Sequence, residues 1–75
     1  MKYILMRIGQ MKQRKTIFFD LYNPMLNKNI EIHYCCYSRH YSIDKIDKVF
    51  DNIRRKTTPI SLDEIDELME RCVIE

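Results

Sequence analysis

The sequence predicts a small α+β domain in which a three-stranded antiparallel sheet is followed by two helices packed on one of its faces, in the order βββαα. Two observations lead to this class. The period of the apolar residues changes from two, typical of strands, to 3.6, typical of helices, after Tyr41. In addition, the connections between the first three segments are short, which favours neighbouring antiparallel strands.

Three segments have the composition of strands. Residues 3–8 form a short apolar run that ends at Gly9, and residues 15–22 are rich in β-branched and aromatic side chains. Residues 23–29 contain three asparagines and a proline, which is the chemistry of a turn. Residues 30–37 begin with alternating apolar and polar side chains and predict the third strand.

Two helices are expected near residues 42–56 and 61–74. Ser42 is a favourable N-cap for the first helix, and Ser61 with Glu64 forms a capping box for the second. Ile60 and Ile65 are placed to make a hydrophobic staple at the same end. The apolar stripes of the two helices are Ile43, Ile46, Val49, Phe50 and Ile53, and then Leu62, Ile65, Leu68, Met69, Cys72 and Val73.

The length of 75 residues predicts one domain, spanning residues 1–75. A core of this size supplies only about 3–5 kcal/mol of net stability and leaves little room for a deep substrate pocket. We therefore expect a binding protein rather than an enzyme, with no cofactor and no small-molecule substrate.

Composition bears on origin and compartment. The chain has eleven isoleucines, one glycine and no alanine, which fits an AT-rich genome and favours a phage or mobile-element protein. The apolar run after Lys2 is interrupted at Arg7, too early for a signal peptide or a membrane span. Three cysteines do not form a disulfide framework. These features predict a protein in the cytoplasm of the producing or host cell that does not act at a membrane.

Strand alternation assigns side chains to the two faces of the sheet. The face expected under the helices carries Ile4, Met6, Ile8, Ile17, Phe19, Leu21, Ile30, Ile32, Tyr34 and Cys36. The opposite face is expected to carry Tyr3, Leu5, Arg7, Thr16, Phe18, Asp20, Tyr22, Glu31, His33, Cys35 and Tyr37. This second face is more aromatic than a merely solvated surface.

One segment contains four side chains of metal-ligand type, namely His33, Cys35, Cys36 and His40. Adjacent residues of a strand point to opposite faces, so Cys35 and Cys36 do not converge on one ion. A cysteine–histidine nucleophile pair would also need an orienting group and an oxyanion site, which the sequence does not indicate. We therefore predict neither a metal site nor a catalytic site.

Charge is distributed unevenly along the chain. Residues 1–40 have a net charge of +5 (seven Lys/Arg, two Asp/Glu), and residues 41–75 a net charge of −3 (six and nine). Acidic residues flank both helical stripes, usually a sign of a solvated helix face. The functional alternative is a phosphate mimic or a patch that binds a basic partner.

These features predict a small protein-interaction module. Its one binding face would contact a different protein, or a second copy of the chain in a homodimer. A phage inhibitor that occludes a host protein, as in host-defence conflicts, is the specific form that we expect. The alternative is a nucleic-acid-binding module that stacks bases on the aromatic face. Basic residues on that face would favour nucleic acid, and scattered ones a protein. The binding residues predicted are Tyr3, Phe18, Tyr22, His33 and Tyr37, with Arg14 and Arg55.

Overall fold

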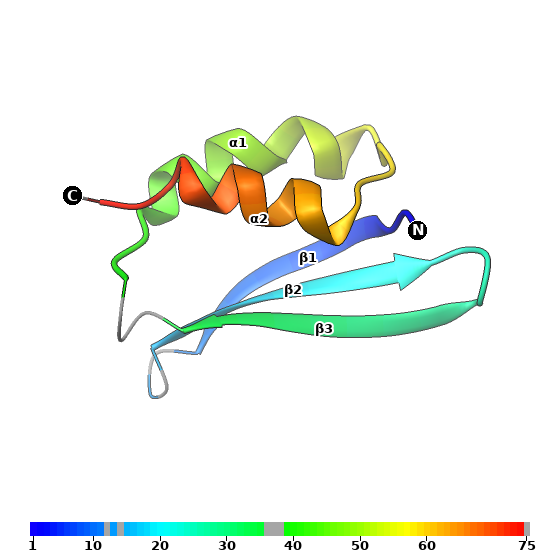
Figure 1. The fold of residues 1–75 in the computed structure, drawn as a ribbon, viewed down its shortest axis with the longest axis horizontal. Helices are drawn as coiled ribbons and strands as arrows, with labels where there is room; N and C mark the ends of the chain where they lie inside the picture. The colour runs from blue at the N-terminus through cyan, green and yellow to red at the C-terminus, as the bar shows by residue number, and fades with distance from the viewer. Residues whose placement is uncertain (12, 14, 36–38, 75) are drawn as a thin grey trace.

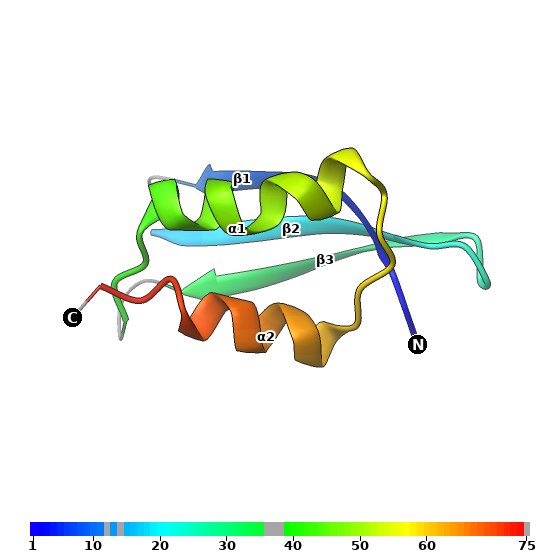
Figure 2. The same ribbon diagram turned by 90° about the horizontal axis from the view of Figure 1, so that it is seen from above.

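The computed structural model describes residues 1–11, 13, 15–35 and 39–74, and it confirms the βββαα order. The strands form one antiparallel sheet in the order β1-β2-β3. Both helices lie side by side on one face of this sheet, with α1 above β1 and β2 and α2 alongside β3, while no helix of the described residues lies on the other face (Figures 1 and 2). The elements are β1 (Ile4–Met11), β2 (Thr16–Asn23), β3 (Lys28–Cys35), α1 (Ile43–Arg55) and α2 (Leu62–Glu70).

The core fills the space between the sheet and the helix pair. The central strand β2 alternates regularly, and its inward residues Ile17, Phe19 and Leu21 are at most 1% exposed. The ring of Phe19 packs edge-on against the ring of Phe50 from α1, with 5.0 Å between centroids. Burying each large apolar side chain contributes about 1.5–3 kcal/mol, so these residues carry much of the stability of the fold.

Both helices begin at the predicted serines. The Ser42 hydroxyl accepts a hydrogen bond from the Lys45 amide at 3.3 Å. The Ser61 hydroxyl accepts from the Glu64 amide at 3.1 Å, and the Glu64 carboxylate accepts from the Ser61 amide at 3.2 Å. The predicted capping box is therefore confirmed, and Ile60 and Ile65 both lie in the core beside it.

The second helix ends at Glu70, earlier than the predicted end at residue 74. The chain after it pairs with the segment before α1 in an antiparallel bridge between Tyr41 and Val73. The Ser42 amide donates to the Cys72 carbonyl, and the Ile74 amide donates to the His40 carbonyl, both at 2.7 Å. These bonds satisfy backbone groups that a longer helix would otherwise have used.

Replacing Ser61 with alanine should lower the free energy of unfolding by about 1 kcal/mol, because it removes one partner of the reciprocal pair. Urea denaturation followed by circular dichroism measures this change. Ser42→Ala is the matched control. The cap hydrogen bond of Ser42 is longer and has no reciprocal partner, so this substitution should lower the free energy of unfolding by less. Equal effects of the two substitutions would show that the reciprocal hydrogen bond from Glu64 does not strengthen the Ser61 cap.

The face assignment for the first half of β1 is wrong. A β-bulge between Leu5 and Arg7 shifts the register, so one extra residue interrupts the alternation. Tyr3 and Leu5, expected on the uncovered face, are 9% and 2% exposed and belong to the core. Met6, expected in the core, is 57% exposed. Ile4 pairs with Tyr22 and so shares its face, whereas Ile8, beyond the bulge, packs against the core as predicted.

Helix α2 is joined to β3 by a polar contact. The Tyr34 hydroxyl donates a hydrogen bond to the Asp66 carboxylate. Burial of the phenol, together with this hydrogen bond and the nearby negative charge, raises the pKa of Tyr34 well above the ordinary range. Tyr34 therefore keeps its hydroxyl proton to a higher pH than an ordinary tyrosine, and the hydrogen bond holds Asp66 on the side of α2 that lies toward β3.

Candidate interaction surface

The face of the sheet away from the helices is the most informative surface of the molecule, and we call it the open face. Cross-strand pairing defines it, because Arg7 lies opposite Asp20, Gly9 opposite Phe18, and Phe18 opposite His33. Paired residues in a sheet point to the same side. The described residues of the open face are Ile4, Arg7, Gly9, Met11, Thr16, Phe18, Asp20, Tyr22, Asn29, Glu31, His33 and Cys35.

Phe18 stands at the centre of the open face, and Gly9 determines how its ring lies. The phenyl ring covers the backbone of β1 at Gly9, where a β-carbon would meet Phe18 Cζ at 2.2 Å and Cε1 at 2.5 Å. Gly9 does not have a positive φ angle, so backbone freedom is not the reason for glycine here. The reason is space, since only glycine lets the ring lie on the strand.

Charged side chains complete a row across the three strands. The Arg7 guanidinium carbon lies 5.1 Å from the centroid of the Phe18 ring, in the range of a cation–π contact. Its Nε also donates to Asp20 Oδ2 at 3.0 Å. On the other side of Phe18, the His33 ring centroid is 6.5 Å away, and His33 Nε2 lies 2.6 Å from Glu31 Oε1. Arg7 is therefore paired with Asp20, and His33 with Glu31, within the face.

The structure brings together only part of the predicted site. Phe18, Tyr22 and His33 lie on the open face, and the Tyr22 hydroxyl donates to Asn27 Oδ1 at 2.8 Å. Tyr3 is a core residue, as described above. Tyr37 and Arg14 lie outside the described residues.

Arg55 is not on the open face. It lies at the end of α1, where its Nε contacts Asp51 Oδ2 at 3.0 Å and its Nη2 donates to Asn52 Oδ1 at 2.7 Å. The face thus holds Arg7 but not Arg55. The role of Gly9 was missed, because the residue was interpreted as the end of a strand that in fact continues to Met11. An isolated glycine within a strand pattern is the signal that would have indicated close packing there.

His33 and Cys35, the side chains of the open face that could bind a metal ion or act as a nucleophile, do not form a metal site or a catalytic pair among the described residues. Cys35 is exposed on the same side as His33, but within the described residues no hydrogen bond joins them. Among residues 1–11, 13, 15–35 and 39–74, no group of three His, Cys, Asp or Glu side chains could hold a metal ion. The chemistry available on this face is stacking, hydrogen bonding and ion pairing.

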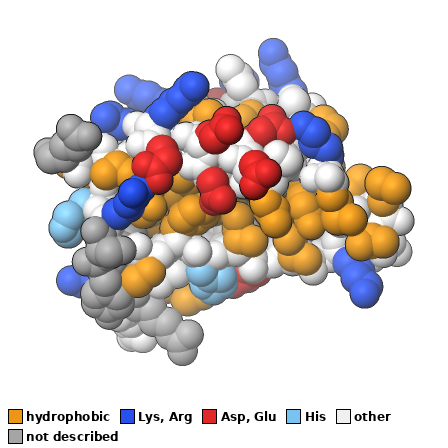
Figure 3. All heavy atoms as spheres, viewed as in Figure 1, with side chains coloured by type: hydrophobic (Ala, Val, Ile, Leu, Met, Phe, Trp, Pro, Cys, Tyr) orange, Lys and Arg blue, Asp and Glu red, His pale blue; other side chains and the backbone are white. Residues whose placement is uncertain are grey.

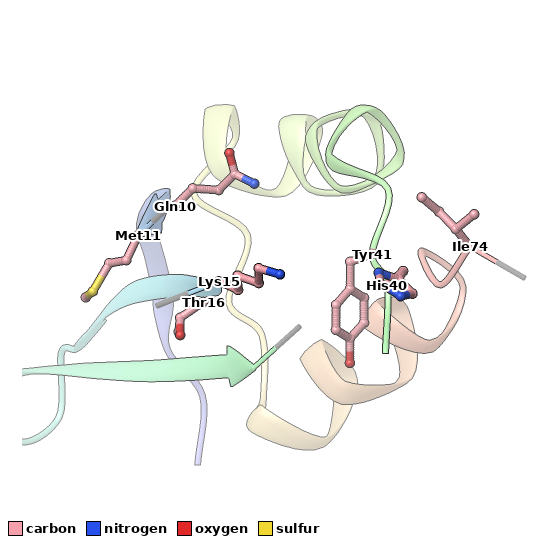
Figure 4. Close-up of a pocket in the computed structure, with 7 residues that line it drawn as sticks. All are labelled: Gln10, Met11, Lys15, Thr16, His40, Tyr41 and Ile74. Atoms are coloured by element: carbon pink, nitrogen blue, oxygen red, sulfur yellow. The ribbon is translucent and has the colours of Figure 1, made fainter. Parts of the chain in front are cut away.

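A depression of about 430 Å³ lies at the end of the sheet away from the β2–β3 hairpin (Figure 4). Its described lining is Gln10, Met11, Lys15, Thr16, His40, Tyr41 and Ile74. The Gln10 amide and the Lys15 ammonium group point toward the space beside Tyr41. No carboxylate is among these described lining residues to orient His40 as a general base, so the depression has the character of a mixed polar surface.

No family model, no curated protein and no solved structure matches this chain. Within the described residues, no helix has both the length and the apolar character needed to span a membrane.

Proposed function

We propose that this protein is a non-enzymatic interaction module that binds another protein through its open face. The observation that supports the proposal most directly is the row of Arg7, Phe18 and His33, which crosses all three strands on the face turned away from both described helices. Aromatic residues and arginine are enriched at the centres of protein interfaces. A ring held flat by Gly9 loses little conformational freedom on binding, which favours affinity.

The distribution of basic residues supports a protein partner over nucleic acid. Arg7 is the basic side chain that the described strand residues place on the open face, and Asp20 already neutralises it. Arg55 lies in the helix layer, bound to Asp51. A surface that follows a phosphate backbone needs several unpaired cations, since these provide most of the affinity.

Nucleic acid remains the second candidate function because of one contact. An arginine above a phenyl ring, with a histidine ring beside it, is a platform on which an unpaired base can stack. Binding to a single-stranded oligonucleotide would then fall steeply as salt increases. A protein partner bound by stacked rings would show a weaker dependence on salt.

The biological form of the interaction is occlusion of a functional surface on the partner. A small domain with one presented face can block another protein without carrying out chemistry. The AT-rich composition favours a phage or mobile-element origin and hence a host protein as the target.

The test is to identify the partner and then measure its affinity for matched variants. A photo-crosslinking residue at Tyr22 should capture a host protein that the same residue at Asp44, on α1, does not capture. With that protein purified, Phe18→Ala should weaken binding by about 1–3 kcal/mol, because it removes a central anchor. Asp44→Ala, which changes the helix layer, is the control and should leave the affinity unchanged.

Two outcomes would contradict the proposal. Equal capture from both crosslinking positions, or equal affinity of wild type and Phe18→Ala for the purified protein, would show that the open face is not the binding surface. Sedimentation analysis of the isolated protein distinguishes self-association, in which case Phe18→Ala would shift a dimer toward monomer.

A further inference from the structure

The helix layer covers the two strands β2 and β3 unequally. The inward residues of β2 are fully buried, whereas Ile30, Ile32 and Tyr34, the inward residues of β3, are only half-buried. A band of hydrophobic side chains accordingly remains at the surface below the acidic residues and runs toward the β2–β3 hairpin (Figure 3). At the hairpin tip, Met25 and Leu26 are 85% and 56% exposed. The band is an apolar strip on the helix side of an edge strand.

Strand β3 also presents a backbone edge. It pairs through all eight of its residues with β2. In the described part of the chain, no backbone hydrogen bond joins β3 to any other segment. Alternate residues of an edge strand direct their N–H and C=O groups outward, where another strand can pair with them.

Of the two edge strands, β1 is protected, whereas no described segment covers β3. Strand β1 has the bulge at Met6, and the residue before the strand, Tyr3, exchanges backbone hydrogen bonds with Ile60 at 2.8 and 2.9 Å. A bulge and a covering segment are the usual devices that prevent strand addition. Neither a bulge nor a proline interrupts β3.

An acidic flank of α2 lies beside this edge. The helical spacing puts Asp63, Asp66, Glu67 and Glu70 on one side of α2. This side of α2 is turned toward β3, because Asp66 accepts a hydrogen bond from the Tyr34 hydroxyl. Figure 3 shows the acidic side chains gathered above the hydrophobic band. Asp63 and Glu67 are both exposed to solvent.

We propose that an extended basic segment of a partner protein adds to β3 as a fourth strand, with arginine or lysine side chains reaching the acidic flank of α2. The outward backbone groups of β3 supply the hydrogen bonds of strand addition. The aliphatic stems of the basic side chains cover Ile30 and Ile32, and their charged ends pair with Asp63 and Glu67. This surface is separate from the open face and rests on different residues.

Charge argues against a second copy of this chain as the occupant. Two β3 strands paired antiparallel, edge to edge, would form one continuous sheet with both helix layers on the same side. The acidic flanks of the two α2 helices would then face each other, and like charges in that position repel. A basic strand meets the same backbone edge with charge attraction instead.

The probe is the acetylated and amidated peptide (Thr-Arg)₄, whose alternation puts all arginines on one side of a strand. Titration into ¹⁵N-labelled protein, followed by NMR, should perturb the amides of β3. Hydrogen exchange should slow at alternate β3 residues, because their outward N–H groups gain acceptors. Strand β1 should not change. The peptide methylated at every backbone nitrogen keeps the charge but has no strand donors, and it should bind at least about tenfold more weakly (1.4 kcal/mol).

Matched protein variants test the acidic flank. Asp63→Asn/Glu67→Gln should weaken peptide binding about fivefold or more, whereas Asp44→Asn/Asp47→Asn, which removes the same charge from α1, should not. Each pair includes one first-turn aspartate, so the effects on helix stability are matched. Phe18→Ala should leave peptide binding intact, which separates this surface from the proposed function of the open face.

Three results would overturn the inference. They are absence of saturable peptide binding, equal binding of the methylated peptide, and perturbations confined to the open face. Dimerisation through β3 without peptide, detected by sedimentation, would assign the edge to a second copy instead.

Discussion

Replacing Phe19 with alanine should remove most of the net stability of the fold, so that about half of the molecules are unfolded at room temperature. The Phe19 ring is 0% exposed and contacts the rings of both Phe50 and Tyr34 edge-on, at centroid distances of 5.0 and 5.6 Å. Truncating a buried phenylalanine costs about 3–5 kcal/mol, because the transfer energy is lost and a cavity remains. That cost is as large as the net stability of about 3–5 kcal/mol expected for a core of this size.

The adjacent residue provides the control for this substitution. Phe18 has the same side chain one position earlier, but it points to the open face and is only half-buried. Phe18→Ala should therefore cost much less and should keep the far-ultraviolet circular dichroism of the folded protein. Circular dichroism of both variants without denaturant compares their folded fractions, and urea denaturation measures the stability of Phe18→Ala. Similar losses from the two substitutions would mean that the open face contributes to the core, contrary to the structure.

The substitution Gly9→Ala should destabilise the protein by about 1–3 kcal/mol, although alanine is ordinarily the better residue within a strand. The new methyl group would occupy the place of the Phe18 ring, which must then leave the strand together with its contacts to Arg7 and His33. In a Phe18→Ala background that obstacle is absent. The same Gly9→Ala change should there stabilise the protein by about 0.5–1 kcal/mol, since glycine loses more conformational entropy on folding.

A double-mutant cycle measures this reversal of sign. The four proteins are wild type, the two single variants and the double variant, each unfolded in urea at the same temperature. The coupling energy between the two positions should be well above 1 kcal/mol. Additive effects of the two substitutions would show that the ring does not rest on Gly9 in solution.

Much of the fold could be predicted because local signals and tertiary packing agree. The alternation of β2, the turn chemistry from Asn23 to Asn27 and the serine caps of both helices each depend on neighbouring residues, and all are present in the structure. The end of α2 is different. The helix stops at Glu70 because Val73 pairs with Tyr41, a contact across the fold that no local pattern reveals.

The candidate site was harder to predict because the faces of β1 depend on one inserted residue. The sequence of the strand contains alternation in both registers, with Ile4, Met6 and Ile8 in one and Tyr3 and Leu5 in the other. The bulge uses each register in turn, so that Tyr3 and Leu5 on one side of it and Ile8 on the other all belong to or pack against the core. Phe18, Tyr22 and His33 lie on strands without a bulge, so alternation alone predicts their face correctly.

The helix pair is tied by backbone hydrogen bonds at both of its ends. The helices are joined at one end by the connection through Ile60, which also pairs with Tyr3, and at the other by the bridge between Tyr41 and Val73. Sliding one helix past the other would break backbone hydrogen bonds at both ends. The helix pair should therefore move as a single body. A partner that docks on the helix pair should then bind it as a rigid body. The helices are already ordered in the free protein, so binding should lose little conformational entropy from them.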